Sequence, residues 1–249
     1  MRVKTYLVKA KMKKNNWLTI IIPCRNEEKY IYNTLESISK QINVEINTVK
    51  IYVADANSTD KTVEKINQAK QDFNLNLEII PGGPVAVGRN NGAKLATTPF
   101  ILFMDADATL DNPMTLSYSA WYGLSGDRLI TCKLKSTSKD FMSKLFFSSF
   151  NVLQKFFFIK PFSTGVYFFT TKETFNELGG FDETVTQSED YLLSRKYKRR
   201  QFRVMNMYAG QDNRRFKKMG YFGFLKFLLL NYINRNNINY FRKDLNYWS

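Results

Sequence analysis

Short runs rich in β-branched residues alternate, from Trp17 onward, with segments whose apolar residues recur at helical spacing. The runs at 17–22, 49–54, 77–80 and 100–104 are expected to be strands, each followed or preceded by a helix. Strands alternating with helices in this way indicate βαβ units on a mostly parallel sheet. The chain is therefore predicted to be an α/β protein with helices flanking that sheet.

The alternation changes after residue 107. Elements are expected there in the order helix, strand, helix, strand and helix, at 113–124, 128–134, 140–158, 165–170 and 188–199. No repeat or low-complexity linker separates the halves, so we predict one domain with a mixed sheet. Its predicted limits are 17–219, with a basic amino-terminal extension at 1–16. Residues 220–249 are predicted to be an amphipathic helical tail, packed on the domain or on a membrane surface.

The chain contains no histidine and two cysteines, Cys24 and Cys132. The absence of histidine excludes Ser/His and Cys/His nucleophile pairs as well as imidazole metal ligands. Two cysteines cannot form a disulfide framework or a cysteine zinc site, which favours a reducing, cytoplasmic setting. Any acid, base or metal chemistry must therefore depend on carboxylates.

Lysine and arginine number 37 against 22 acidic residues, a net charge of +15. Such a charge attracts nucleic acid, an anionic membrane surface or phosphorylated small molecules. We find no nucleic-acid-binding motif, so nucleic acid is the least favoured of the three. The amino terminus lacks the pattern of a secretory signal, and the apolar stretch at 221–233 is shorter than a spanning helix. The predicted location is cytoplasmic, either free or peripheral on the cytoplasmic face of a membrane.

Polar residues follow three of the predicted strands. Ligands of open α/β sheets bind beyond the carboxyl ends of the strands, where these residues are expected to lie together. They are Pro23, Arg25, Asn26 and Glu27 after the first strand, Asp55, Asn57, Ser58 and Asp60 after the second, and Asp105 and Asp107 after the fourth.

The sequence FMDADA places Asp105 and Asp107 on one side if the segment stays extended. Two such carboxylates can share a divalent cation. The alternative is a turn whose aspartates cap a helix.

Six blocks occur in order: IIIPCRNEEKYI, VADANSTDKT, GRNNGAKLA, FMDADA, TGVYFFTTKETFNELGGFDE and SEDYLLSRK. Together they resemble the inverting glycosyltransferases of family 2, over about Thr19 to Arg215. The resemblance implies the GT-A fold, a Rossmann-like mixed sheet. It also implies transfer of a sugar from a nucleoside-diphosphate-sugar, UDP-sugar favoured and GDP-sugar as the alternative, to a glycan or glycolipid hydroxyl.

The resemblance assigns roles to residues. Asp55 would bind the nucleotide base, Arg89 would lie near the diphosphate, and FMDADA would be the DXD motif. The full donor-binding set is Pro23, Arg25, Asn26, Glu27, Asp55, Arg89, Asp105 and Ala106. A solvated helix arginine is the alternative for Arg89.

Asp107 would bind Mn²⁺ or Mg²⁺ at the diphosphate, with Asp105 contacting the metal or the ribose. Many relatives add a late histidine, which this chain lacks, so Asp212 is chosen as the third ligand. Arg214 and Arg215 resemble paired arginines of a loop that closes over the diphosphate. A solvated basic turn is the alternative for that pair.

Asp190 is the expected general base, and a single displacement would invert the anomeric configuration. Gly165 and Glu189 would lie on the acceptor side. The alternative for Glu189 and Asp190 is favourable acidity in the first turn of a helix.

The helix expected at 140–158 and the tail are aromatic and flanked by lysines. They either cover the sheet or dock on an anionic bilayer, in which case the acceptor would be lipid-linked or membrane-proximal. Two other functions remain open: a non-catalytic nucleotide-sugar-binding protein and a sugar nucleotidyltransferase. The second expects a glycine-rich loop after the first strand, where this chain has PCRNEE.

Overall fold

The computed structural model describes residues 16–156 and 160–243. Within those ranges one sheet contains the strands β1 (Leu18–Cys24), β2 (Lys50–Asp55), β3 (Leu77–Pro81), β4 (Phe100–Phe103), β5 (Thr109–Leu110), β6 (Leu129–Ser136), β7 (Phe168–Thr171) and β8 (Phe202–Gln211). Their order across the sheet is β3-β2-β1-β4-β7-β6-β8-β5. β1 to β4 are mutually parallel, and β7 runs antiparallel to both β4 and β6. The predicted mixed sheet is confirmed.

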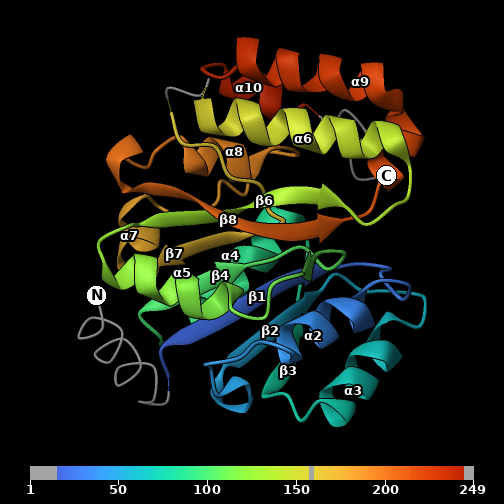
Figure 1. Ribbon diagram of the computed structural model, residues 1–249, viewed down its shortest axis with the longest axis vertical. Helices are drawn as coiled ribbons and strands as arrows, with labels where there is room; N and C mark the ends of the chain where they lie inside the picture. Colours follow the sequence, from blue (N-terminus) through green and yellow to red (C-terminus); the bar gives the residue numbers. More distant parts are fainter. Residues whose placement is uncertain (1–15, 157–159, 244–249) are drawn as a thin grey trace.

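Helices cover both faces of this sheet (Figure 1). They are α2 (Ile31–Ser39), α3 (Thr62–Asp72), α4 (Val85–Leu95), α5 (Thr115–Leu124), α6 (Phe141–Phe156), α7 (Lys172–Glu177), α8 (Glu189–Ser194), α9 (Arg214–Ile233) and α10 (Ile238–Phe241), with 3-10 turns η1 (Ile46–Thr48) and η2 (Arg199–Gln201).

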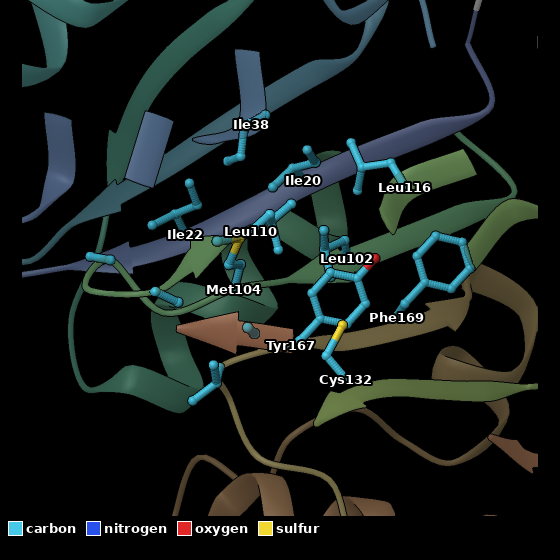
Figure 2. Packing of buried hydrophobic residues seen from close by; sticks show 14 of the residues in the cluster. Ile20, Ile22, Ile38, Leu102, Met104, Leu110, Leu116, Cys132, Tyr167 and Phe169 are labelled. Carbon is cyan, nitrogen blue, oxygen red and sulfur yellow. The ribbon is translucent and has the colours of Figure 1, made fainter. Parts of the chain in front are cut away.

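Successive side chains of β1 point to opposite faces, as the two-residue period of a strand requires. Ile20 and Ile22 belong to the larger apolar cluster, which also contains buried residues of α2, α3, α5 and α6. Figure 2 shows residues of this cluster, among them Ile20 and its β4 partner Leu102. Ile21 points to the other face, into a cluster shared with α4 and α7.

Gly92 determines how closely α4 approaches the sheet. A Cβ at this position would lie 2.6 Å from Cγ2 of Ile21, so any larger residue would push the helix away. The same helix carries Arg89, three residues before Gly92.

The last strands were the least predictable part. β8 was not predicted, because its sequence FRVMNMYAGQ contains one β-branched residue, Val204, and it pairs with β6 across a register shift between Cys132 and Lys133. The short strand β5 was also missed. The expected helix at 188–199 ends at Ser194, where the amides of Lys196 and Tyr197 bond to carbonyls three residues back and tighten the chain.

The remaining boundaries shift by a few residues, and β7 begins at Phe168 rather than 165 because residues before it form a turn. Residues 1–15 of the predicted extension, and 157–158 of the predicted aromatic helix, lie outside the described ranges. The boundary predicted at 219/220 falls inside α9, at Gly220, whose φ of 70° and ψ of 157° interrupt the helix. Whether the tail forms a separate unit stays a prediction. Among the described helices, none has the length and apolarity needed to cross a bilayer.

Candidate active site

Hydrogen bonds join the loop after β1 to the loop after β2 at the carboxyl edge of the sheet. Cys24 pairs with Asp55 at the strand ends. The Asn26 amide donates to Oγ of Ser58 at 2.9 Å, and the Glu27 amide donates to Oγ1 of Thr62 at 2.7 Å. These bonds bring the residues predicted on the two loops together at one edge, as expected from parallel strands.

Asp55 is held in place at the end of β2. Oδ1 accepts a hydrogen bond from Oγ of Ser58 at 2.5 Å, and Oδ2 accepts one from the Ser58 amide at 3.1 Å. Behind it, Gly82 lies so close that a Cβ would be 2.6 Å from the carbonyl carbon of Asp55. The carboxylate is therefore fixed, half-buried, next to the half-buried Pro23 and the exposed Arg25.

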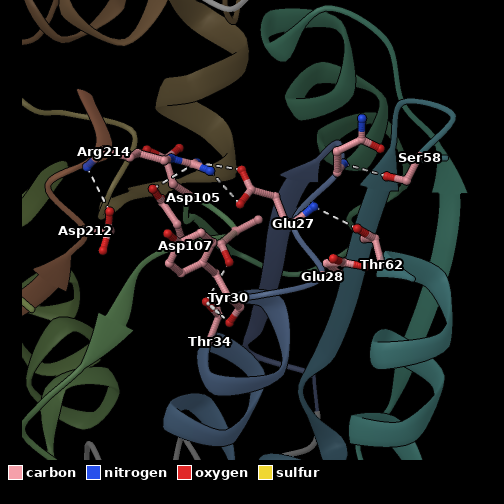
Figure 3. A network of polar contacts seen from close by, with 12 residues as sticks. Glu27, Glu28, Tyr30, Thr34, Ser58, Thr62, Asp105, Asp107, Asp212 and Arg214 are labelled. Carbon is pink, nitrogen blue, oxygen red and sulfur yellow. Dashed lines mark hydrogen bonds and ion pairs between the residues drawn. The ribbon is translucent and has the colours of Figure 1, made fainter. Parts of the chain in front are cut away.

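The DXD segment does not stay extended. The Ala108 amide donates to the Asp105 carbonyl at 3.1 Å, which makes residues 105–108 a turn. The buried Ala106 anchors this turn, because its carbonyl accepts Oγ1 of Thr34 at 2.7 Å. Asp105 and Asp107 thus lie close together through a turn (Figure 3). Asp105 binds Arg89, and Asp107 binds Arg214.

Arg214, the first residue of α9, binds the carboxylates of Glu27 and Asp107. Its two terminal nitrogens donate to both carboxylate oxygens of Glu27, at 2.8 and 2.6 Å, and Nη2 lies 2.9 Å from Oδ2 of Asp107. Its guanidinium lies over the ring of Tyr30. Burial raises the pKa of Glu27, while the hydrogen bond and charge of Arg214 act in the opposite direction. The side chain of Arg215 lies outside what the structure describes.

Asp212 is not grouped with the DXD pair. Its Oδ1 accepts the backbone amide of Arg214 at 2.8 Å, so the carboxylate holds the first turn of α9. Among the described residues no three carboxylate or cysteine side chains form a metal-binding group. The predicted trio of Asp105, Asp107 and Asp212 is thus not grouped among the described residues, and Asp212 as the third metal ligand stays a prediction.

Asp107 and Asp105 remain suitable for a metal that is shared with a ligand. Mg²⁺ usually takes one or two protein carboxylates, and substrate phosphates and water complete its octahedron. Carboxylate oxygens also suit Mn²⁺. The donor set therefore fits a divalent cation held jointly with a diphosphate.

Arg89 is placed differently from expectation. Its side chain is 1% exposed, and its terminal nitrogens bind Oδ1 of Asp105 at 2.7 Å and Oε1 of Glu189 at 2.5 Å. Burial lowers the pKa of Arg89, but the carboxylates of Glu189, Asp105 and Asp190 outweigh that effect and raise it. The guanidinium is therefore paired within the protein, and its predicted position near a diphosphate stays a prediction. Arg89 joins the DXD turn to the start of α8.

Asp190 follows Glu189 in the first turn of α8. Its Oδ2 accepts the Gly165 amide at 2.6 Å and its Oδ1 accepts the Tyr191 amide at 2.6 Å. Burial and the charge of Asp105 raise the pKa of Asp190, although Arg89 lowers it. The pKa of its buried neighbour Glu189 is raised for the same main reason, burial.

Gly165 must be a glycine here. A Cβ would lie 1.9 Å from Nη2 of Arg89 and 2.6 Å from Oδ1 of Asp105. The residues predicted on the donor and acceptor sides, Asp105, Gly165, Glu189 and Asp190, therefore meet around one buried guanidinium.

Asn90 is a supporting residue that the sequence reasoning missed. Its side-chain amide donates to the Phe181 carbonyl at 2.9 Å and to Oε1 of Glu183 at 2.8 Å, and its oxygen accepts the Phe181 amide at 3.1 Å. These hydrogen bonds connect α4 to the segment before α8. Its position beside Arg89 in the block GRNNGAKLA was the available signal.

Residues 19–117 match the family model described as glycosyl transferase family 2. A poly(ribitol-phosphate) beta-N-acetylglucosaminyltransferase, TarS, of Staphylococcus aureus is 29% identical over 123 residues, which are 48% of this chain and 21% of the relative. A teichoic acid poly(glycerol phosphate) polymerase of Staphylococcus epidermidis is 33% identical over 98 residues, 38% of this chain and 13% of the relative. The chain thus matches about a fifth or less of the length of these relatives.

Two kinds of solved structure share the fold. Residues 1–349 of S. aureus TarS in complex with UDP-GlcNAc superpose with a TM-score of 0.60 at 21% identity, covering 78% of this chain and 58% of that one. A mannosyltransferase of Pyrobaculum calidifontis in complex with GDP-Man and Mn²⁺ gives 0.63 at 20% identity, covering 91% and 72%.

Proposed function

We propose that the chain is a glycosyltransferase of family 2, whose model matches residues 19–117, and that it transfers a sugar from a nucleoside-diphosphate-sugar to an acceptor hydroxyl with inversion at the anomeric carbon. The observation that carries the proposal is the ion pairing of buried Arg89 with both Asp105 and Glu189, the residue next to Asp190. This arrangement places the acidic DXD turn and a carboxylate with a raised pKa at one sheet edge.

The donor site is proposed at the ends of β1, β2 and β4. Asp55, oriented by Ser58, would accept hydrogen bonds from the nucleotide base. UDP is favoured as the nucleotide and GDP is the alternative, since the solved relatives were seen with UDP-GlcNAc and with GDP-Man. Pro23, Arg25 and Asn26 would line the same pocket.

Asp107 and Asp105 would hold Mn²⁺ or Mg²⁺ together with the diphosphate. The bound ion would supply positive charge to the leaving group. Arg214 already neutralises Asp107 and Glu27 at this position, and its guanidinium fork suits phosphate oxygens as well as carboxylates. It would therefore reorient toward the diphosphate when the donor enters.

Asp190 would act as the base. The acceptor oxygen forms a bond to the anomeric carbon while the bond from that carbon to the diphosphate breaks, and the hydroxyl proton passes to the Asp190 carboxylate. Both of its oxygens accept backbone amides, and each retains a lone pair for that proton. The raised pKa makes this carboxylate a stronger base than an exposed aspartate.

The test uses UDP-GlcNAc, UDP-glucose and GDP-mannose with added Mn²⁺ or Mg²⁺. Binding is measured by thermal shift, and turnover is measured as release of the nucleoside diphosphate with and without glycan acceptors. Metal-dependent release that is lost in Asp190→Asn supports the proposal. Saturable donor binding without any release, across all donors and acceptors tried, would favour the non-catalytic binding protein instead.

A further inference from the structure

The carboxyl-terminal half of α9 leaves a row of apolar side chains in solvent. Phe222, Leu225, Leu229 and Ile233 recur every three or four residues and are 81%, 54%, 56% and 60% exposed. The opposite side of the helix, which includes Phe227, is packed on the protein. Large side chains on one face at helical spacing form a continuous exposed stripe.

A second stripe lies on the neighbouring helix α6. Phe141 is 73% exposed, and Leu145 and Val152 are each 50% exposed, while Phe147 and Phe150 are buried. The two helices lie side by side at one end of the molecule (Figure 1) and contact each other through Phe146, whose ring packs on Phe216 and Phe224. A hydrogen bond from Tyr221 to Asp140 also joins them. We call this surface the α6–α9 face, represented by Phe141, Leu145, Val152, Phe222, Leu229 and Ile233.

The charged residues within helices α6 and α9 are all basic. Neither α6 nor α9 contains an aspartate or glutamate. Lys144, Lys217, Lys218 and Lys226 are exposed on these helices. An apolar stripe bordered by lysines is suited to a lipid bilayer, whose headgroups can be anionic and whose interior is apolar. A second copy of this chain, also at +15, would be repelled by the same charges.

The α6–α9 face is linked directly to the candidate active site. Arg214, in the first turn of α9, binds Glu27 and Asp107. Farther along the helix, Nδ2 of the Asn231 side chain donates to Oγ of Ser188 at 2.9 Å, two residues before Asp190. The Thr186 amide donates to the carbonyl of Phe241 in α10 at 2.9 Å. A partner on this face would therefore lie beside the helices that support the proposed base.

We propose that the α6–α9 face docks on an anionic lipid bilayer, with the apolar stripes entering the interface and the lysines contacting lipid phosphates. This goes beyond the proposed transfer reaction and does not depend on it, because lipid binding requires no donor. Docking would hold the acceptor side of the site near the membrane surface.

Sedimentation of the full chain with vesicles tests the proposal. Vesicles of phosphatidylglycerol and phosphatidylcholine are compared with vesicles of phosphatidylcholine alone. We expect binding to the anionic vesicles, weakened several-fold when the salt rises to about 0.5 M, because screening shortens the reach of the lysines. The double variant Phe222→Ser/Leu229→Ser should bind roughly tenfold less at low salt.

Ile42→Ser is the matched control, because Ile42 is 49% exposed and follows α2, away from the α6–α9 face. It should bind vesicles like the parent. Thermal unfolding confirms that each variant is folded. Absence of binding to anionic vesicles overturns the proposal, and so does equal binding by the double variant. A stable dimer in light scattering that Phe222→Ser/Leu229→Ser dissociates would assign the face to a second copy instead.

Discussion

The two halves of the candidate site are assembled differently. On the donor side, β1 lies between β2 and β4 and runs parallel to both. The loops that follow β1 and β2 are hydrogen-bonded to each other, as Asn26 is to Ser58, and the two residues are separated by about one βαβ unit. On the acceptor side, Gly165 precedes an antiparallel strand, Asp190 lies in the first turn of the short helix α8, and α9 comes from late in the chain. The donor half is therefore local in sequence, whereas the acceptor half depends on long-range contacts.

Arg89 is where the halves meet, since it binds Asp105 from one side and Glu189 from the other. The contrast teaches that a recognisable donor motif can depend on partners far along the chain. Substitutions in the two halves should therefore change donor binding and sugar transfer to different extents.

Asp190→Asn should have the largest effect, and it should act on sugar transfer without changing donor binding. We expect transfer to fall by about 10²- to 10⁴-fold, the usual contribution of a general base, with donor affinity unchanged. Steady-state turnover and a UDP-sugar binding titration measure the two effects. Parent-like transfer by this variant would remove Asp190 from the role of base.

Arg89→Met should damage both halves together. Two buried carboxylates would lose their partner, and we expect a loss of about 3–5 kcal/mol in the free energy of unfolding. Arg203→Met is the control, because Arg203 is 49% exposed in its pair with Asp127 and should cost at most about 1 kcal/mol. Urea unfolding compares them. Similar small losses would show that the halves are not joined through Arg89.

Gly165→Ala tests the same junction without removing a charge. The new Cβ would meet Nη2 of Arg89 at 1.9 Å, so we expect a loss of about 1–3 kcal/mol and reduced transfer. At Gly223 the nearest atom to an added Cβ is 3.7 Å away, so Gly223→Ala should keep or raise stability. Thermal unfolding distinguishes the pair, and equal melting temperatures would contradict the close packing.

Asp107→Asn should weaken the donor half alone. We expect metal-dependent affinity for the nucleoside diphosphate to fall by about 10- to 100-fold. Calorimetric titration of UDP with and without Mn²⁺ measures it. If UDP binds the variant and the parent alike in Mn²⁺, Asp107 does not hold the metal.

The pH dependence of kcat/KM should report the acceptor half. The base must be ionised, and the folded-state pKa of Asp190 is raised by burial, so activity should be lost with falling pH earlier than for an ordinary aspartate. Glu189→Gln removes a nearby negative charge and should move the acidic limb to lower pH. If the acidic limb of the kcat/KM profile does not move in Glu189→Gln, the group that titrates there is not Asp190.

Much of the donor half could be predicted because its pattern is local. The four parallel strands follow from runs of apolar residues, and their loops carry Asp55 and the DXD aspartates at the strand ends. The turn at 105–108 was one of two alternatives that the sequence left open. The register of β8, and the pairing of Arg89, depend on residues roughly a hundred positions away and could not be predicted.

The sequence by itself determined the α/β class, the parallel start of the sheet and the restriction of any site chemistry to carboxylates, because periodicity and composition are local properties. Only the tertiary structure decided that Arg89 is buried between two carboxylates rather than open to a ligand, and that Asp212 holds a helix start rather than joining the DXD pair. The physical reason is that the environment of a charged side chain is set by burial and by partners from other elements, which no local pattern contains.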